Sequence, residues 1–232
     1  MDSNKKIART AGLLYLIVVV TGIVSLIYVP SQITVHGDAS ATVRNIVASE
    51  ALFRFGIVTG LICYTAFLVL PLALYKLLSP VGRNAAVLMV TLAVASVPIS
   101  FVSLLYKLDV LTLLSGAGYL QAFTTNQLQA QMMLSLDAYS NGILISSVFW
   151  GLWLLPFGYL VFKSAFLPRV LGVLLMIGGF GDLCDVLGHV LFPGYVDTVI
   201  ASFVTLPGSF GEIGICLWLL IMGAREPAPS VG

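Results

Sequence analysis

Residues 140–163 read SNGILISSVFWGLWLLPFGYLVFK and carry no charged side chain before the final Lys163. A run of about 20 apolar residues is long enough to cross the hydrocarbon core of a bilayer as a helix. Helix is the expected conformation because a backbone surrounded by lipid must satisfy its hydrogen bonds within its own segment. The stretch therefore predicts a transmembrane helix.

The same apolar pattern recurs along the whole chain. Of its 232 residues, 59% are hydrophobic and only 9% are charged, whereas a soluble domain carries about 25% charged residues. The mean hydropathy of +1.05 points the same way, and a net charge of +1 creates no field that would attract nucleic acid. The expected spans are 10–29, 50–77, 84–108, 140–163, 168–190 and 199–223. We predict an all-α, single-domain bundle of six transmembrane helices over residues 1–225, embedded in a lipid bilayer, with a short disordered tail over 226–232.

The connections predict the orientation of the bundle. The links at 79–84 and 163–169 are short, whereas those at 30–49 and 109–139 are long and lie on the opposite side. Eight of the eleven lysines and arginines fall on the side of the short links: Lys5, Lys6, Arg9, Lys76, Arg83, Lys163, Arg169 and Arg225. Arg44, Arg54 and Lys107 fall on the other side. Because cytoplasmic loops are enriched in basic residues, we expect both termini to be cytoplasmic.

Helical segments are expected in both long links. Asp38 is a plausible N-cap for a helix that runs into the second span. Residues 119–136 carry apolar side chains at mostly helical spacing beside a glutamine-rich polar face without lysine. A helix that lies on a lipid surface usually has basic residues on its polar face. We therefore expect the second segment to be a cap lying across the outer ends of the helices.

Charged side chains inside the expected spans are the candidate functional residues, because they are costly in hydrocarbon unless paired, protonated or hydrated. Asp182, Asp185 and His189 follow the spacing i, i+3, i+7, which places them on one helix face. Glu212 lies near the middle of the last span, after Pro207 and between two nearby glycines. This combination favours a kink or a water-filled notch.

The polar groups of several spans are expected to meet in one pocket just beneath the outward surface. The predicted polar core or ligand-binding set is Glu50, Arg54, Lys107, Asp137, Asn141, Asp182, Asp185, His189 and Glu212. Helix kinks near this set are expected at Pro71, Pro156 and Pro207. The simplest ion pair joins Arg54 to Asp182 or Glu212. The aromatic residues are interpreted as interface belts and packing rather than as a cofactor site: Tyr15, Tyr28, Tyr106, Tyr159, Trp150, Trp153 and Trp218.

Three classes of function remain open from these residues. In the first, an outward-facing pocket binds or moves a small molecule, an ion or a lipid. In the second, a dry and fully paired polar lock serves a structural or partner-binding protein. In the third, Asp182, Asp185 and His189 hold a metal for intramembrane hydrolysis, with His36 as a further ligand. No phosphate loop, G-x-S-x-G or H-E-x-x-H motif is present, so no catalytic residue, resident metal or cofactor is predicted. The oligomeric state is left open.

Five segments of the sequence carry a resemblance to a known family. They read KIARTAGLLYLI, SEALFRFGI, FWGLWLLPFGYLVFKSAFLPRVLGVLLMIGG, GDLCDVLG and GEIGICLWLLIMG. With these segments the chain resembles the bacterial membrane family named domain of unknown function 4386 over nearly its whole length. The resemblance implies six helices in a bacterial cytoplasmic membrane and a polar core of Glu50, Arg54, Asp185 and Glu212. It implies no particular activity, substrate or cofactor.

Overall fold

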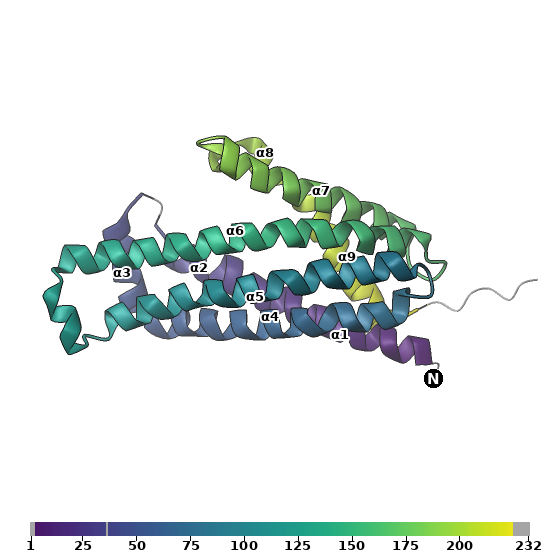
Figure 1. Ribbon diagram of the computed structural model, residues 1–232, viewed down its shortest axis with the longest axis horizontal. Helices are drawn as coiled ribbons and strands as arrows, with labels where there is room; N and C mark the ends of the chain where they lie inside the picture. Colours follow the sequence, from purple (N-terminus) through teal and green to yellow (C-terminus); the bar gives the residue numbers. More distant parts are fainter. Residues whose placement is uncertain (1–2, 36, 225–232) are drawn as a thin grey trace, which may run out of the picture.

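The computed structural model describes residues 3–35 and 37–224 of the chain (Figure 1). This part of the chain is helical and contains no strand, and six of its helical segments are long and apolar enough to cross a membrane, as predicted. The first span combines α1 (Ser3–Gly22), a π-helix η1 (Ile23–Tyr28) and α2 (Val29–Ile33). The other spans are α4 (Glu50–Leu78), α5 (Arg83–Leu114), α6 (Thr125–Lys163), α7 (Arg169–Leu191), and α8 (Val199–Phe203) with α9 (Leu206–Ile221).

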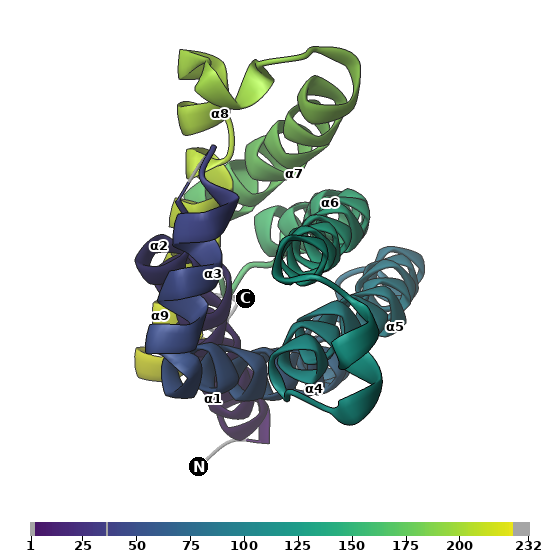
Figure 2. The ribbon, with the colours of Figure 1, turned by 90° about the vertical axis from the view of Figure 1, so that its left-hand side faces the viewer.

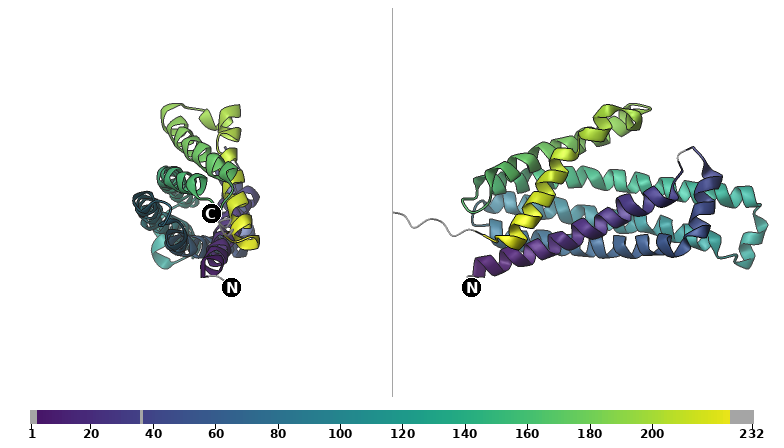
Figure 3. Two further views of the ribbon diagram at one scale, coloured as in Figure 1. Left: turned by 90° about the vertical axis from the view of Figure 1, so that its right-hand side faces the viewer. Right: turned by 180° about the vertical axis from the view of Figure 1, so that it is seen from behind.

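The six spans run up and down, so the start of α1 and the end of α9 lie at the same end of the molecule. The short links α4–α5 and α6–α7 lie at this end as well (Figure 1). The long links gather at the opposite end, and α7 and α8 diverge from α5 and α6 toward that end (Figures 1 and 3). The expected tail at 226–232 lies outside the described residues.

The first long link folds much as expected. It forms α3 (Ala39–Ala48), and the Asp38 carboxylate caps this helix by accepting a hydrogen bond of 2.8 Å from the backbone N–H of Ala41. The helix does not run straight into the second span. It ends at Ser49, where the chain turns and α4 begins at Glu50.

The second long link differs from the expected cap. A short 3-10 helix, η2 (Gly118–Ala122), follows the end of α5. The helix α6 then starts at Thr125 and continues for 39 residues. Thr124 and Gln127 form a capping box at this start, in which each side chain bonds the other residue's backbone N–H. Because no residue after this cap interrupts the helix, residues 125–136 are the first turns of the fourth span. They lie alongside the last turns of α5 rather than across the helix ends (Figures 1 and 2).

Close helix contacts hold α7 against its two neighbours. A side chain at Gly178 of α7 would overlap the backbone of Gly208 in α9, and one at Gly151 of α6 would come within 2.8 Å of the carbonyl oxygen of Gly179. Small residues let membrane helices approach closely, which replaces the hydrophobic driving force that lipid does not provide. These contacts place Asp182 and Glu212, each one helical turn from such a glycine, near one another.

The Gly178 contact predicts a specific loss of stability. We expect Gly178→Ala to lower the unfolding temperature of the purified protein in detergent by several degrees, because the added methyl group forces α7 and α9 apart, and overpacking of this kind costs about 1–3 kcal/mol. Gly118→Ala is the control, since a methyl group there meets no atom within 4 Å. Equal unfolding temperatures for the two variants would contradict this account of the helix contact.

Candidate functional site

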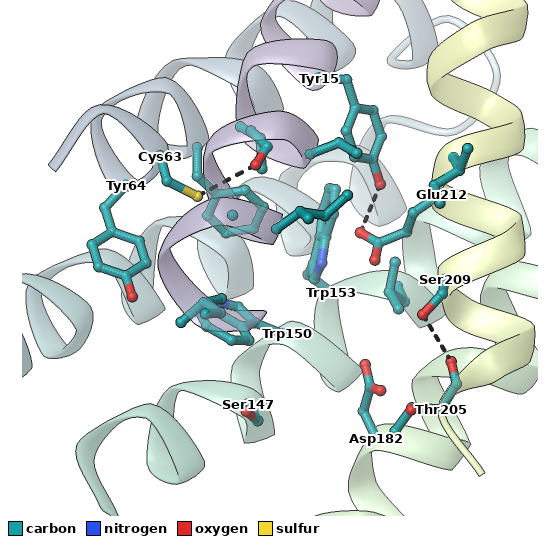
Figure 4. A pocket seen from close by; sticks show the side chains of 18 of the residues that line it. Tyr15, Cys63, Tyr64, Ser147, Trp150, Trp153, Asp182, Thr205, Ser209 and Glu212 are labelled. Carbon is teal, nitrogen blue, oxygen red and sulfur yellow. Dashed lines mark hydrogen bonds between the residues drawn. The ribbon is translucent and has the colours of Figure 1, made fainter. Parts of the chain in front are cut away.

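A partly open cavity of about 320 Å³ lies between five of the six spans (Figure 4). It is bordered by α1 and η1, α4, α6, α7 and the start of α9, while α5 does not contribute. Its size falls at the lower end of the range that small-molecule sites occupy. We call it the acidic cavity. The side chains discussed below that line it are Tyr15, Cys63, Tyr64, Phe67, Trp150, Trp153, Asp182, Asp185, Ser209 and Glu212.

Carboxylates give the acidic cavity its charge. Asp182 of α7 and Glu212 of α9 point into the same space (Figure 4), and Asp185 lines it one turn further along α7. The hydroxyl of Tyr15 in α1 donates a hydrogen bond of 2.8 Å to Glu212 Oε1. Asp182 has no hydrogen-bond or ion-pair partner within the described residues. The described lining includes no lysine, arginine or histidine, although His189 Nδ1, further along α7, lies 3.4 Å from Asp185 Oδ2.

Aromatic rings form much of the remaining wall. Trp153 is buried, stacks on Phe157 with ring centroids 5.1 Å apart, and receives Phe67 edge-on at 5.2 Å. The indole N–H of Trp150 donates a hydrogen bond of 3.2 Å to the Ser96 hydroxyl. These contacts fix both indole rings, so the wall is formed before any ligand arrives.

Two interruptions of regular helix lie beside the acidic cavity. The π-helix η1 supplies Ile23 and Leu26 to its lining, and π-helical turns occur often at functional sites. The last span is interrupted at Val204 and Thr205, and Pro207 then occupies the first turn of α9. Both interruptions therefore lie in spans that border the cavity, while the carboxylates themselves sit on the continuous helices α7 and α9.

The predicted polar set is divided between several places in the structure. Asp182, Asp185 and Glu212 share the acidic cavity. Lys107 and Asp137 line a second, smaller pocket. Asn141 is exposed, and Pro71 and Pro156 are buried inside α4 and α6. None of the three prolines, including Pro207, lines the acidic cavity.

The expected pairing of Arg54 with Asp182 or Glu212 is not what the structure shows. Arg54 Nε lies 2.7 Å from Glu50 Oε1 on its own helix, and both side chains are about half exposed. Residues at i and i+4 of a helix face each other, so Arg54 finds a partner without crossing the bundle. This pair is a surface feature near the start of α4 and is not part of the acidic cavity.

His189 belongs to the far end of α7. Its Nδ1 lies 3.4 Å from Asp185 Oδ2, and its ring meets the Tyr195 ring at a centroid distance of 5.1 Å. Within the described residues, no three histidine, cysteine or acidic side chains come together as metal ligands would. The hypothetical set of Asp182, Asp185 and His189 is therefore not assembled here, and His36, its proposed fourth member, lies outside the described residues.

Sequence reasoning missed the aromatic side of the site. Tyr15, Trp150 and Trp153 were interpreted as interface belts and packing, yet all three line the acidic cavity. The hydropathy pattern cannot distinguish a tryptophan at the membrane surface from one that lines a cavity between the helices. The one available signal was depth, because Tyr15 and Trp153 fall well inside their apolar runs rather than at the ends, where interfacial aromatics gather.

Comparison with known proteins identifies the family. The model of the family described as a domain of unknown function, DUF4386, matches residues 10–223. The chain belongs to this family. An uncharacterized protein of the archaeon Archaeoglobus fulgidus is 30% identical over 154 residues, which cover 66% of this chain and 74% of the relative. No solved structure matches the chain. The DUF4386 match confirms the resemblance seen in the sequence.

The Tyr15–Glu212 hydrogen bond predicts a stability effect. We expect Tyr15→Phe to destabilise the protein by about 1–2 kcal/mol, because it removes one hydrogen bond from a carboxylate inside the membrane span. Thermal unfolding in detergent measures this effect. Tyr159→Phe, at an exposed position of α6, is the control and should unfold like the unchanged protein. An unaltered unfolding temperature for Tyr15→Phe would show that the bond contributes nothing.

Proposed function

We propose that this DUF4386 protein binds a small organic cation in the acidic cavity. The observation that carries the proposal is the meeting of Asp182, Asp185 and Glu212 in one cavity without any basic side chain in its described lining. Carboxylates are costly inside a membrane protein unless something compensates them. The chain supplies part of that compensation, because Tyr15 donates a hydrogen bond to Glu212 and His189 lies against Asp185. Asp182 has no such partner in the described residues, and a bound cation would supply it.

The aromatic wall favours an organic cation over a metal ion. Aromatic faces carry partial negative charge and attract a cation within about 6 Å of the ring centroid, most strongly when the ring is tryptophan. Trp150 and Trp153 present fixed rings to the cavity, and Phe67 and Tyr64 add apolar and aromatic surface. An ammonium group with alkyl substituents can therefore face the carboxylates with its charge and the rings with its carbon atoms.

A purely structural polar lock fits these contacts less well. Such a lock pairs its polar groups with one another and leaves no space between them. Here Asp182 lacks a hydrogen-bond or ion-pair partner in the described part of the chain, and a cavity of about 320 Å³ lies between the surrounding helices. The interrupted helices beside the cavity resemble the broken spans that hold substrates in transporters, so the proposal extends to moving the cation through the protein.

A matched pair of probes tests the binding proposal. Choline carries a quaternary ammonium group, and 3,3-dimethylbutan-1-ol has the same shape with a neutral carbon in place of nitrogen. We expect choline to change the tryptophan fluorescence of the purified protein, because Trp150 and Trp153 line the cavity, and we expect the neutral alcohol not to do so. Asp182→Asn and Glu212→Gln should each weaken choline binding about tenfold or more, a loss of about 1.4 kcal/mol.

Asp197→Asn serves as the control for these variants. It removes an equivalent charge from an exposed position in the short helix η3 (Tyr195–Asp197), outside the cavity, so choline should bind this variant as it binds the unchanged protein. Glu212→Gln keeps an acceptor for the Tyr15 hydroxyl, which preserves the contact between α1 and α9. Equal affinity for choline and its neutral analogue, or unchanged binding in both cavity variants, refutes the proposal.

We further propose that the protein lies in the cytoplasmic membrane with both termini in the cytoplasm. The short links near Arg83 and Arg169 lie at the same end as the start of α1 (Figure 1), and this end carries most of the lysines and arginines. In that orientation the acidic cavity lies in the outward half of the bundle, because Asp182 and Asp185 are in the second half of α7.

Cysteine labelling in intact cells tests the orientation. A single cysteine introduced at Gly118 in η2, on a background with the three native cysteines replaced, should react with a membrane-impermeant maleimide added outside. A cysteine introduced at Gly82, in the α4–α5 link, should react only after the cells are opened. The reverse pattern would overturn the orientation and place the cavity on the cytoplasmic side.

A further inference from the structure

A second pocket lies at the end of the bundle where the long links gather. It has a volume of about 120 Å³ and is enclosed by the end of the first span, the start of α4, α5 and the first half of α6. Its lining includes Lys107, Asp137, Tyr139 and Ser140 beside apolar side chains such as Phe53 and Leu136. We call it the Lys107 pocket.

Lys107 is unusual because its side chain is buried. The residue is only 4% exposed, and its ammonium nitrogen lies 3.9 Å from the centroid of the Tyr139 ring. Within the described residues, no carboxylate lies within 4.0 Å of this nitrogen and it donates no hydrogen bond. Lysine is almost never buried without a partner, and an aromatic ring compensates only part of the lost hydration.

The depth of Lys107 indicates what surrounds it in a membrane. Along α5 it lies about 36 Å from Arg83, at about 1.5 Å per residue. The hydrocarbon core of a bilayer is about 30 Å thick, and Arg83 marks the opposite boundary. Lys107 is therefore at the level of the lipid headgroups, where phosphate groups are the most abundant anions.

We propose that the Lys107 pocket binds the phosphate group of a membrane phospholipid. The ammonium group would neutralise the phosphate, and the apolar side chains would contact the glycerol and the first acyl carbons. The Ser140 hydroxyl lies in the same lining but donates its hydrogen to the Leu136 carbonyl oxygen. Asp137 is exposed and also lines the pocket. Its charge repels a doubly charged free phosphate more than the singly charged phosphodiester of a lipid, so the lipid is the favoured source.

This site is independent of the acidic cavity. The two have no lining residue in common, and the Lys107 pocket selects an anion whereas the acidic cavity selects a cation. Tyr64 lines the first and Tyr139 the second, and both belong to one buried cluster with Cys63 and Leu104. A lipid bound at Lys107 would thus rest against the back of the wall that faces the cation site.

The test compares two lipids that differ only in the phosphate headgroup. Dioctanoyl phosphatidylglycerol and dioctanoylglycerol are added separately to delipidated protein in a neutral detergent, and thermal unfolding is recorded. We expect the phospholipid to raise the unfolding temperature by several degrees, as a ligand of the folded state does. Dioctanoylglycerol and inorganic phosphate, each at the same concentration, should raise it by less than about one degree.

Substitutions assign the effect to Lys107. Lys107→Met should abolish the phospholipid shift while leaving stability without lipid equal or higher, because it removes a buried charge that nothing else neutralises. Lys107→Arg should retain most of the shift. Lys163→Met is the matched control, since Lys163 also lies over a tyrosine ring, at 5.8 Å from the centroid of Tyr159, but is exposed. Its shift should equal that of the unchanged protein.

Three outcomes would overturn the proposal. A full phospholipid shift in Lys107→Met shows that the lipid binds elsewhere, and an equal shift from dioctanoylglycerol shows that the phosphate is not recognised. An equal shift from inorganic phosphate identifies a site for free phosphate rather than for lipid. The comparison of ligands on the unchanged protein decides the question even where Lys107→Met fails to fold.

Discussion

The carboxylate of Glu212 in the middle of the last span is the group around which the rest of the structure is arranged. A carboxylate at this depth is costly in lipid, so the surrounding spans must shield it. The hydroxyl of Tyr15 bonds it from α1, and the glycine contact between Gly178 and Gly208 draws α7 alongside α9. The same contact brings Asp182 to the same space, which adds negative charge instead of balancing it.

Hydropathy and spacing were sufficient for the fold. The six spans follow from apolar runs interrupted by short polar links, because lipid permits few alternatives to helix. The i, i+3 spacing of Asp182 and Asp185 also indicated a shared face, and Glu212 stood out as a carboxylate near the middle of an apolar run. All three line the acidic cavity. In each case the cost of a buried charge restricts where the side chain can point.

The failures have a different physical origin. Arg54 was expected to reach across the bundle, but Glu50 on the same helix is close enough to pair with it. Residues 125–136 of the expected cap form the start of α6 instead, because a capping box at Thr124 begins a helix that nothing downstream interrupts, while the first part of the segment forms η2. The sequence shows which charged side chains need a partner. Whether that partner is a neighbour on the same helix or a residue on another helix depends on the three-dimensional packing. The aromatic wall was missed for a related reason, since a cavity between the helices leaves no pattern in hydropathy.

The two pockets contain opposite charges that are kept apart in the structure: carboxylates in the acidic cavity and the ammonium group of Lys107 in the other pocket. A chain that only needed to stabilise its fold would be expected to pair Lys107 with one of the acidic side chains inside the bundle. Instead Lys107 lies against Tyr139, and a buried cluster that includes Tyr64 and Leu104 separates it from Asp182 and Glu212. Within the described residues, neither Lys107 nor Asp182 has an oppositely charged partner, whereas Asp185 Oδ2 lies 3.4 Å from His189 Nδ1. The two proposals assign a partner of opposite charge to each pocket: a cation among the carboxylates, and an anion from the headgroup layer at Lys107. Tyr64 lines one site and Tyr139 the other, and both belong to the one buried cluster that lies between the two charges.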